Sequence, residues 1–253
     1  MSTRVFIDTP LGVDAELALP SGPARHVQVL RLQPGAPLRL FDGEGGEWDA
    51  VVTHMGRSEV QVRVGAHVAV DRELARRVTI AVGMPANERM DTLIEKATEL
   101  GVAAIVPLMC ERSVLRLQGE RAAKKLTHWR GVAIAACEQS GRTRLPQLHP
   151  VATLADWLKT LPPVASDSAA SREARWLLSL DREANAVAGA LTALAPGNDT
   201  SICVLSGPEG GLSMTEQSLA WRSGFTPVGL GPRVLRADTA PLVALAALAC
   251  LAT

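Results

Sequence analysis

The sequence predicts an α/β protein: a mostly parallel sheet covered by helices, preceded by a small β-rich domain. Up to about residue 70, short apolar stretches are broken by Gly, Pro and Asp, a pattern typical of a small antiparallel sheet or barrel. After residue 77, short apolar strands alternate with longer helical stretches, which is typical of a parallel sheet between helices. We therefore predict two domains, residues 1–70 and 71–253.

Four strands and one helix are predicted in the first domain. The segment 59–64 alternates polar and apolar residues with a period of two, and the glycine-rich segment 41–46 is a turn candidate. The strands are expected at 4–7, 37–41, 47–53 and 59–64, and the helix at 22–32.

In the second domain, helices are expected between successive strands. The segment 88–100, for example, places Met90, Leu93 and Ile94 on one helical face. Strands are expected at 78–82, 103–107, 176–180, 202–206 and 227–230, and helices at 88–100, 119–139, 184–194, 214–222 and 239–251. Residues 161–171, rich in Pro, Ser and Ala, are interpreted as a surface loop.

Composition limits the class of protein. The 253 residues are 47% apolar and 21% charged, which is ordinary for a globular chain with a true core. The 26 basic and 26 acidic residues balance, and this counts mildly against a nucleic-acid partner, although the segment 71–147 is locally basic. The longest apolar run, 241–252, is far shorter than the roughly 20 residues that cross a bilayer, so no membrane partner is expected.

The cysteines and histidines favour a reducing compartment and no metal. No CxxC spacing or histidine ligand motif occurs, and the start of the chain does not have the pattern of a signal peptide. We expect a cytoplasmic protein in which four cysteines are buried thiols: Cys110, Cys137, Cys203 and Cys250.

Two glycine-rich segments carry the strongest functional signal. The first, 206–213, follows a predicted strand and leads into a helix with Ser213 as N-cap and Glu216 three residues later. Bare backbone at the end of a parallel strand can approach a ligand closely, although neither a GxGxxG nor a phosphate-loop spacing is present. A single Gly-Gly pair is better interpreted as a tight turn between strand and helix. A second glycine-rich segment, 229–236, also follows a predicted strand, and two such loops together favour a pocket for a flat heterocycle.

Two polar clusters are less specific. The segment 136–142 ends an amphipathic helix, with Gly141 as its cap, and 87–91 opens the helix after the first strand of the second domain. The commoner interpretation of both is a polar helix end that faces water.

Taken in order and spacing, several motifs resemble the RsmE family of SPOUT-class methyltransferases. They are Arg89–Asp91, Lys96–Val102, Pro107–Leu108 with Glu111–Ser113, Glu138–Arg142, Gly207–Gly211 and Leu230–Arg236, joined near the amino terminus by His26–Arg31 and Leu40–Gly43. The resemblance spans nearly the whole chain. It departs at Ala86–Glu88, where the family often has Lys-Gly-Asp, and at Ala237–Thr239, where it has Thr-Glu-Thr.

The resemblance implies a fold and an activity. It implies an amino-terminal PUA-like β-barrel for RNA, a SPOUT domain with a deep carboxyl-terminal trefoil knot, and a homodimer. The implied reaction is methylation of N3 of uridine 1498 in 16S rRNA, within the small ribosomal subunit, with S-adenosylmethionine as methyl donor. No metal is required, because the sulfonium already activates the methyl group.

The same resemblance and the chemistry of the reaction suggest site residues. The cofactor is expected to contact Leu180, Ser206, Gly207, Pro208, Glu209, Gly210, Gly211, Leu230, Gly231, Arg233 and Leu235. For catalysis we expect Arg236 and Arg142 to stabilise the uridine anion or a nearby phosphate, and Glu138 to accept the proton. RNA contacts are expected at Arg4, Arg25, Arg31, Arg89 and Arg112, although each of these could equally be a solvated surface arginine.

Two rival functions remain open at this point. One is a non-catalytic rRNA-binding module with a decayed cofactor pocket, which would bind RNA but not S-adenosylmethionine. The other is an unrelated α/β enzyme that binds ATP or NAD in the glycine loops; the missing phosphate-loop and dinucleotide spacings count against it.

Overall fold

The computed structural model describes residues 3–57, 59–163, 173–181, 183–194 and 201–251. It divides into two compact units. The first comprises Met1–Glu73 with Ile134–Leu145, and the second comprises Leu74–Ala133 with Pro146–Thr253. Helix α3 (Gly119–Ser140) therefore contributes its last residues to the first unit, which a division of the chain near residue 70 does not anticipate.

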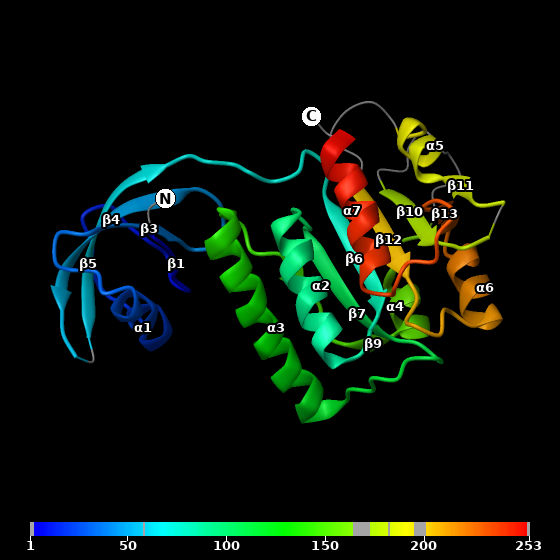
Figure 1. The fold of residues 1–253 in the computed structure, drawn as a ribbon, viewed down its shortest axis with the longest axis horizontal. Helices are drawn as coiled ribbons and strands as arrows, with labels where there is room; N and C mark the ends of the chain where they lie inside the picture. The colour runs from blue at the N-terminus through cyan, green and yellow to red at the C-terminus, as the bar shows by residue number, and fades with distance from the viewer. Residues whose placement is uncertain (1–2, 58, 164–172, 182, 195–200, 252–253) are drawn as a thin grey trace. The chain divides into compact units, whose positions relative to one another are not determined.

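Among the described residues, the first unit is built on a five-stranded sheet with the order β1-β3-β4-β5-β2. Figure 1 labels β1, β3, β4 and β5 of this sheet and the helix α1. The elements are β1 (Thr3–Phe6), β2 (Glu16–Ala18), α1 (Ser21–Val29), β3 (Pro37–Phe41), β4 (Glu47–Met55) and β5 (Val60–Val68). The expectation of an antiparallel sheet is confirmed except at one edge, where β1 pairs with β3 in parallel. The chain passes through β2 and α1 between them, which is long enough for the crossover that a parallel pair requires.

A small apolar cluster explains why the end of α3 belongs to this unit. It contains Phe6, Phe41 and Cys137, with Ile134 and Leu145 packed against them. The rings of Phe6 and Phe41 meet edge to face with their centroids 5.6 Å apart. The backbone N–H of Phe6 also donates to Oε1 of Glu138 at 3.0 Å. Strand β1 is thus tied to a residue 132 positions further along the chain, and β3 packs against the same segment.

The second unit contains a parallel sheet, as the sequence predicts. In the part of the chain that the structure describes, the order is β11-β13-β10-β12-β6-β7-β8, with β9 also paired to β7. The strands are β6 (Val78–Gly83), β7 (Ala104–Met109), β8 (Gln147–Leu148), β9 (Ala152–Thr153), β10 (Glu173–Leu178), β11 (Asn185–Ala186), β12 (Ser201–Ser206) and β13 (Thr226–Gly229).

Helices cover both faces of this sheet. The helices, besides α3, are α2 (Asn87–Glu99), α4 (Leu154–Thr160), α5 (Val187–Thr192), α6 (Met214–Arg222) and α7 (Thr239–Leu251). Neighbouring strand residues point to opposite faces: Ile80 and Val204 pack with α2 and α7, whereas Ala81 and Leu205 pack with α4 and α6. Burial on both faces explains why the strands are continuous apolar runs.

Several details differ from the sequence-based expectations. The short elements β2, β8, β9, β11 and α4 are not anticipated, and most of the loop predicted at 161–171 lies outside the described residues. Three cysteines are buried, but the prediction is wrong for Cys250, which is exposed. It follows the buried Leu248 by two positions on α7, and about 200° of helical rotation turns it to the opposite side.

Two absences concern only the residues that the structure describes. None of their helices is long and apolar enough to cross a membrane. No group of three or more His, Cys, Asp or Glu side chains in those residues is placed to hold a metal ion.

Candidate functional site

A cavity of about 530 Å³ lies in the second unit, where three neighbouring strands end. Its walls come from the segments that follow β10, β12 and β13, which are adjacent in the sheet, and from α6 and the start of α7. The carboxyl ends of parallel strands are the usual ligand position in such sheets, and the volume suits a small organic ligand.

Most of the predicted cofactor residues line this cavity. Nine of the eleven do so: Leu180, Ser206, Gly207, Pro208, Gly211, Leu230, Gly231, Arg233 and Leu235. The other two, Glu209 and Gly210, do not line it and instead contact neighbouring segments. The three loops that are far apart in sequence therefore converge on one space.

The glycine loop 206–213 is shaped by close backbone approaches. A Cβ on Gly207 would lie 3.0 Å from the backbone nitrogen of Leu212, and Gly211 has a φ of +68°. At the end of β6, a Cβ on Gly83 would lie 2.5 Å from Cδ and 2.6 Å from the nitrogen of Pro208. Sequence reasoning missed Gly83, although a glycine that ends an apolar strand is the signal that points to such a contact.

Glu209 and Gly210 brace the loop from outside the cavity. Oε1 of Glu209 accepts a hydrogen bond from the Ala86 N–H at 3.1 Å and lies 3.4 Å from Nη1 of Arg89. The Gly210 carbonyl accepts a hydrogen bond from Arg112 at 3.0 Å. Of the predicted RNA-binding residues, Arg89 thus contacts the glycine loop and Arg112 also lines the cavity.

The helix after the loop begins as the sequence predicts. Ser213 and Glu216 form a capping box, in which each side chain accepts the other residue's backbone N–H, at 3.2 and 2.9 Å. The buried Glu216 carboxylate also accepts the Glu111 N–H at 2.8 Å. The segment after β7 is therefore tied to the start of α6.

One face of α6 supplies a wall that the sequence analysis missed. Met214, Gln217 and Trp221 line the cavity at spacings of three and four residues, which place them on one side of a helix. Met214 and Trp221 are exposed, and so is Leu180, which also lines the cavity. Helical spacing next to a glycine loop is the signal that identifies this wall.

The predicted catalytic residues are distributed between the two units. Arg236 is exposed in the second unit and does not line the cavity. Glu138 belongs to the first unit, where burial raises the pKa of its carboxyl group and Nδ1 of His26 lies 3.5 Å away.

Arg142 has a structural contact that the sequence did not suggest. It is only 3% exposed and forms an ion pair with Glu73 inside the first unit, with Nε donating to Oε1 at 3.1 Å. The water-facing interpretation is wrong for this side chain, because the carboxylate of Glu73, five residues after the end of β5, pairs with it in a buried position. To contact the uridine anion as predicted, the Arg142 guanidinium would have to leave its ion pair with Glu73.

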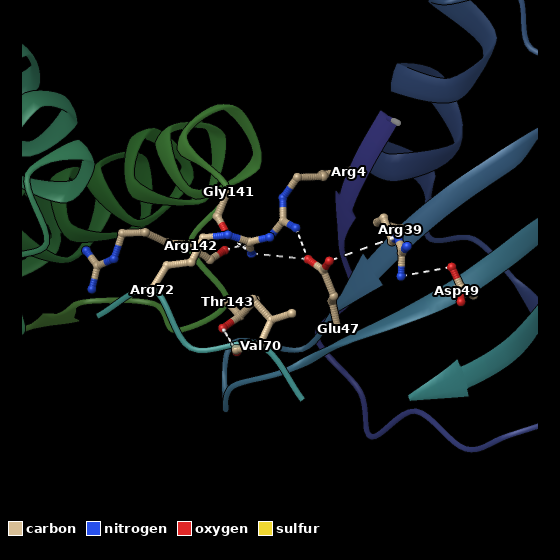
Figure 2. A network of polar contacts seen from close by, with 9 residues as sticks. All are labelled: Arg4, Arg39, Glu47, Asp49, Val70, Arg72, Gly141, Arg142 and Thr143. Atoms are coloured by element: carbon tan, nitrogen blue, oxygen red, sulfur yellow. Dashed lines mark hydrogen bonds and ion pairs between the residues drawn. The ribbon is translucent and has the colours of Figure 1, made fainter. Parts of the chain in front are cut away.

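Arg4 belongs to a polar network in the first unit (Figure 2). It forms an ion pair with the buried Glu47 and donates to the Arg142 carbonyl at 2.8 Å. Nη1 of Arg72 lies 3.5 Å from the same Glu47 carboxylate and donates to the Gly141 carbonyl at 2.8 Å. Arg4 thus fixes the segment that follows α3, whereas Arg25 and Arg31 are exposed on the first unit.

No buried thiol is prepared to act as a nucleophile. Burial raises the pKa values of Cys110, Cys137 and Cys203 to about 12, so these thiols are protonated at neutral pH. Chemistry at the cavity therefore depends on its loops, its arginines and a bound ligand.

The fold and the cavity define an α/β protein that binds a small ligand between glycine-rich loops at the carboxyl ends of its strands. Comparison with protein families indicates which reaction such a protein catalyses. A family described as an RNA methyltransferase domain matches residues 72–249, and one described as an RNA methyltransferase PUA domain matches residues 24–65.

Relatives narrow the assignment. The ribosomal RNA small subunit methyltransferase E of Synechocystis sp. is 34% identical over 97% of this chain and 77% of its own length; that of Bacillus subtilis is 33% identical over 88% and 84%. The crystal structure of the Neisseria gonorrhoeae enzyme of the same name, bound to S-adenosyl methionine, is 32% identical with a TM-score of 0.87, covering 99% of this chain and 98% of that one. The chain belongs to the ribosomal RNA small subunit methyltransferase E family.

Proposed function

We propose that the protein transfers the methyl group of S-adenosylmethionine to N3 of a uridine in 16S rRNA, and that this uridine is position 1498. The observation that carries the proposal is the convergence of three predicted cofactor loops on one cavity, and a relative is reported bound to S-adenosyl methionine. Family membership counts against the alternative of an unrelated enzyme that uses ATP or NAD.

The residues of the cavity fit this cofactor. Leu180, Trp221 and Pro227 offer apolar surface to a flat adenine, and the glycine loop allows close approach of backbone N–H groups. When bound, the cofactor supplies a methyl group already activated by its sulfonium. The protein's contribution is then mainly the alignment of donor and acceptor.

The acceptor nitrogen carries a proton that must leave. We assign stabilisation of the uridine anion to Arg236, because its side chain is exposed near the cavity loops, whereas Arg142 is paired with Glu73. Glu138 remains the proposed proton acceptor, and burial raises the pKa of its carboxyl group above the ordinary value, which makes the carboxylate a stronger base.

The two domains have different tasks in this proposal. Residues 1–70 hold RNA, supported by the match to a PUA domain of RNA methyltransferases, and the exposed Arg25 and Arg31 contact phosphates. Residues 71–253 hold the cofactor and carry out methyl transfer. Binding of RNA through these arginines should weaken as salt increases.

Three further features are proposed from the family resemblance. The loops around the cavity form a deep trefoil knot, the protein is a homodimer, and it acts in the cytoplasm on the small ribosomal subunit. Support for the dimer comes from α7, which has no charged residue and leaves Val243 exposed.

Calorimetric titration of the purified protein with S-adenosylmethionine tests the proposal, with ATP and NAD as controls in the same buffer. Selective binding of the methyl donor is expected, followed by transfer of labelled methyl groups to a uridine in small-subunit rRNA. Binding of rRNA without any binding of S-adenosylmethionine would instead support the non-catalytic module.

Replacing Arg236 with alanine should lower kcat about a hundredfold, because an anion-stabilising group is removed. The dissociation constant of S-adenosylmethionine should not change, since this side chain does not line the cavity. The exposed Arg222, at the end of α6, provides the matched control: its alanine variant should retain full turnover. Normal turnover of the Arg236 variant would remove this residue from the mechanism.

A further inference from the structure

Arg112 is exposed and lies at the wall of the cavity. It follows β7 and lines the cavity, and its Nη1 donates to the Gly210 carbonyl at 3.0 Å. A guanidinium has five N–H donors in a rigid fork, so this contact anchors the group and leaves donors for a second acceptor. An arginine fixed in this way is suited to bind an anion in a defined orientation.

The segment that carries Arg112 is itself held in place. The Cys110 N–H donates to Oγ of Ser113 at 3.0 Å, and the Glu111 N–H donates to the buried Glu216 carboxylate at 2.8 Å. The base of the Arg112 side chain is pressed against the glycine loop, because a Cβ on Gly210 would lie only 2.9 Å from the Arg112 Cβ. The guanidinium therefore needs little ordering when a ligand arrives.

The cavity differs in character along the sheet. Leu180, Pro227 and Trp221 come from the segments around β10, β13 and α6 and give that region an apolar surface. Arg112 extends from the end of β7, which is separated from β10 by β6 and β12 in the strand order. Arg233, the other cation in the lining, belongs to the loop after β13, so Arg112 is the cation that accompanies the glycine loop.

S-adenosylmethionine likewise has an apolar end and a charged end. Its adenine is flat and largely apolar, and its methionine end carries a carboxylate, the only anionic group of the molecule. Resting on the proposed function, we propose that Arg112 binds the carboxylate of the methionine moiety and so directs the adenine toward the apolar surface. A charge-assisted arginine–carboxylate contact is strong and directional, which makes Arg112 a positioning residue for the methyl donor.

The experiment separates the carboxylate from the rest of the ligand and is done without RNA. Arg112→Gln is titrated with S-adenosylhomocysteine, which has the carboxylate, and with methylthioadenosine, which lacks the whole amino-acid part. The dissociation constant of S-adenosylhomocysteine should rise at least about tenfold, and that of methylthioadenosine should stay the same. Arg112→Lys, which keeps the charge but not the fork, should give an intermediate loss.

Arg116→Gln is the matched control. Arg116 lies four residues further along the chain, also donates one hydrogen bond to a backbone carbonyl, that of Glu111 at 3.0 Å, and does not line the cavity. Its variant should bind both ligands like the parent protein.

The possible results are distinguishable. Equal weakening of both ligands by Arg112→Gln would mean that Arg112 only holds the glycine loop and would overturn the proposal. Unchanged binding of both, with reduced binding of rRNA, would overturn it in favour of a phosphate contact. If the parent protein binds neither S-adenosylmethionine nor S-adenosylhomocysteine, the proposed function itself fails.

Discussion

Replacement of Gly83 with valine is expected to abolish measurable binding of S-adenosylmethionine. Any Cβ at this position would lie 2.5 Å from Cδ and 2.6 Å from the backbone nitrogen of Pro208, and valine adds two further methyl groups. Because the obstacle includes backbone, it cannot be relieved by a change of side-chain rotamer. The loop 206–213 would have to move away from β6, and the cavity that it lines would lose its shape.

The measurement is a titration of the variant with S-adenosylmethionine, together with its thermal unfolding. We expect the affinity to fall more than about a hundredfold, a larger effect than the loss of one hydrogen bond. Gly131→Ala in α3 is the control, because nothing lies within 4 Å of a Cβ there, and alanine favours the helix. A Gly83 variant that binds the cofactor normally would show that the loop can shift without cost.

Replacement of Glu47 with glutamine should destabilise the protein by about 3 kcal/mol, because it leaves buried arginine charge without its partner. The Glu47 side chain is 7% exposed and forms an ion pair with Arg4, whose side chain is 11% exposed. Arg72 lies 3.5 Å from the same carboxylate (Figure 2). A neutral amide cannot offset these charges. Unfolding in urea, followed by circular dichroism, measures the change.

A second ion pair in the same unit serves as the control. Glu16 and Arg63 meet at 2.9 Å, but their side chains are 50% and 63% exposed, so Glu16→Gln should cost less than about 1 kcal/mol. A double variant with methionine at both Arg4 and Glu47 should recover much of the lost stability, because an apolar pair leaves no buried charge. Equal effects of Glu47→Gln and Glu16→Gln would contradict the argument from burial.

Local patterns predict the elements that are long and periodic. Helices α6 and α7 have the bounds expected from the sequence, because the capping residues Ser213 and Glu216 and a continuous apolar run mark their positions. Strands of two or three residues, such as β2 and β11, are too short to show a period and exist through their pairing with longer strands. The parallel pairing of β1 with β3 likewise depends on the crossover and not on either strand alone.

The candidate site also contains features that the sequence predicts and features that it does not. The glycine loops could be predicted, since glycine at a strand end has a specific physical reason, and the resemblance connected them with the loop at Leu180. The position of Gly83 at a strand end indicates a close contact, but its partner Pro208 could not be predicted, and neither could the pairing of Arg142 with Glu73, because each contact joins residues that are distant in sequence. For the same reason Arg112 was expected at RNA and was found in the lining of the cavity.

The membership of Ile134–Leu145 in the first unit limits how the protein can be dissected and recombined. A gene fragment that stops near residue 70 omits Cys137, Ile134 and Leu145, which complete the apolar cluster around Phe6, and also the Glu138 carboxylate that its backbone N–H requires. The first unit is therefore not a segment that could be exchanged between homologues at one junction. A working chimera would need three crossover points, after residues 73, 133 and 145. Substitutions in the two segments of the first unit would therefore have to be exchanged together.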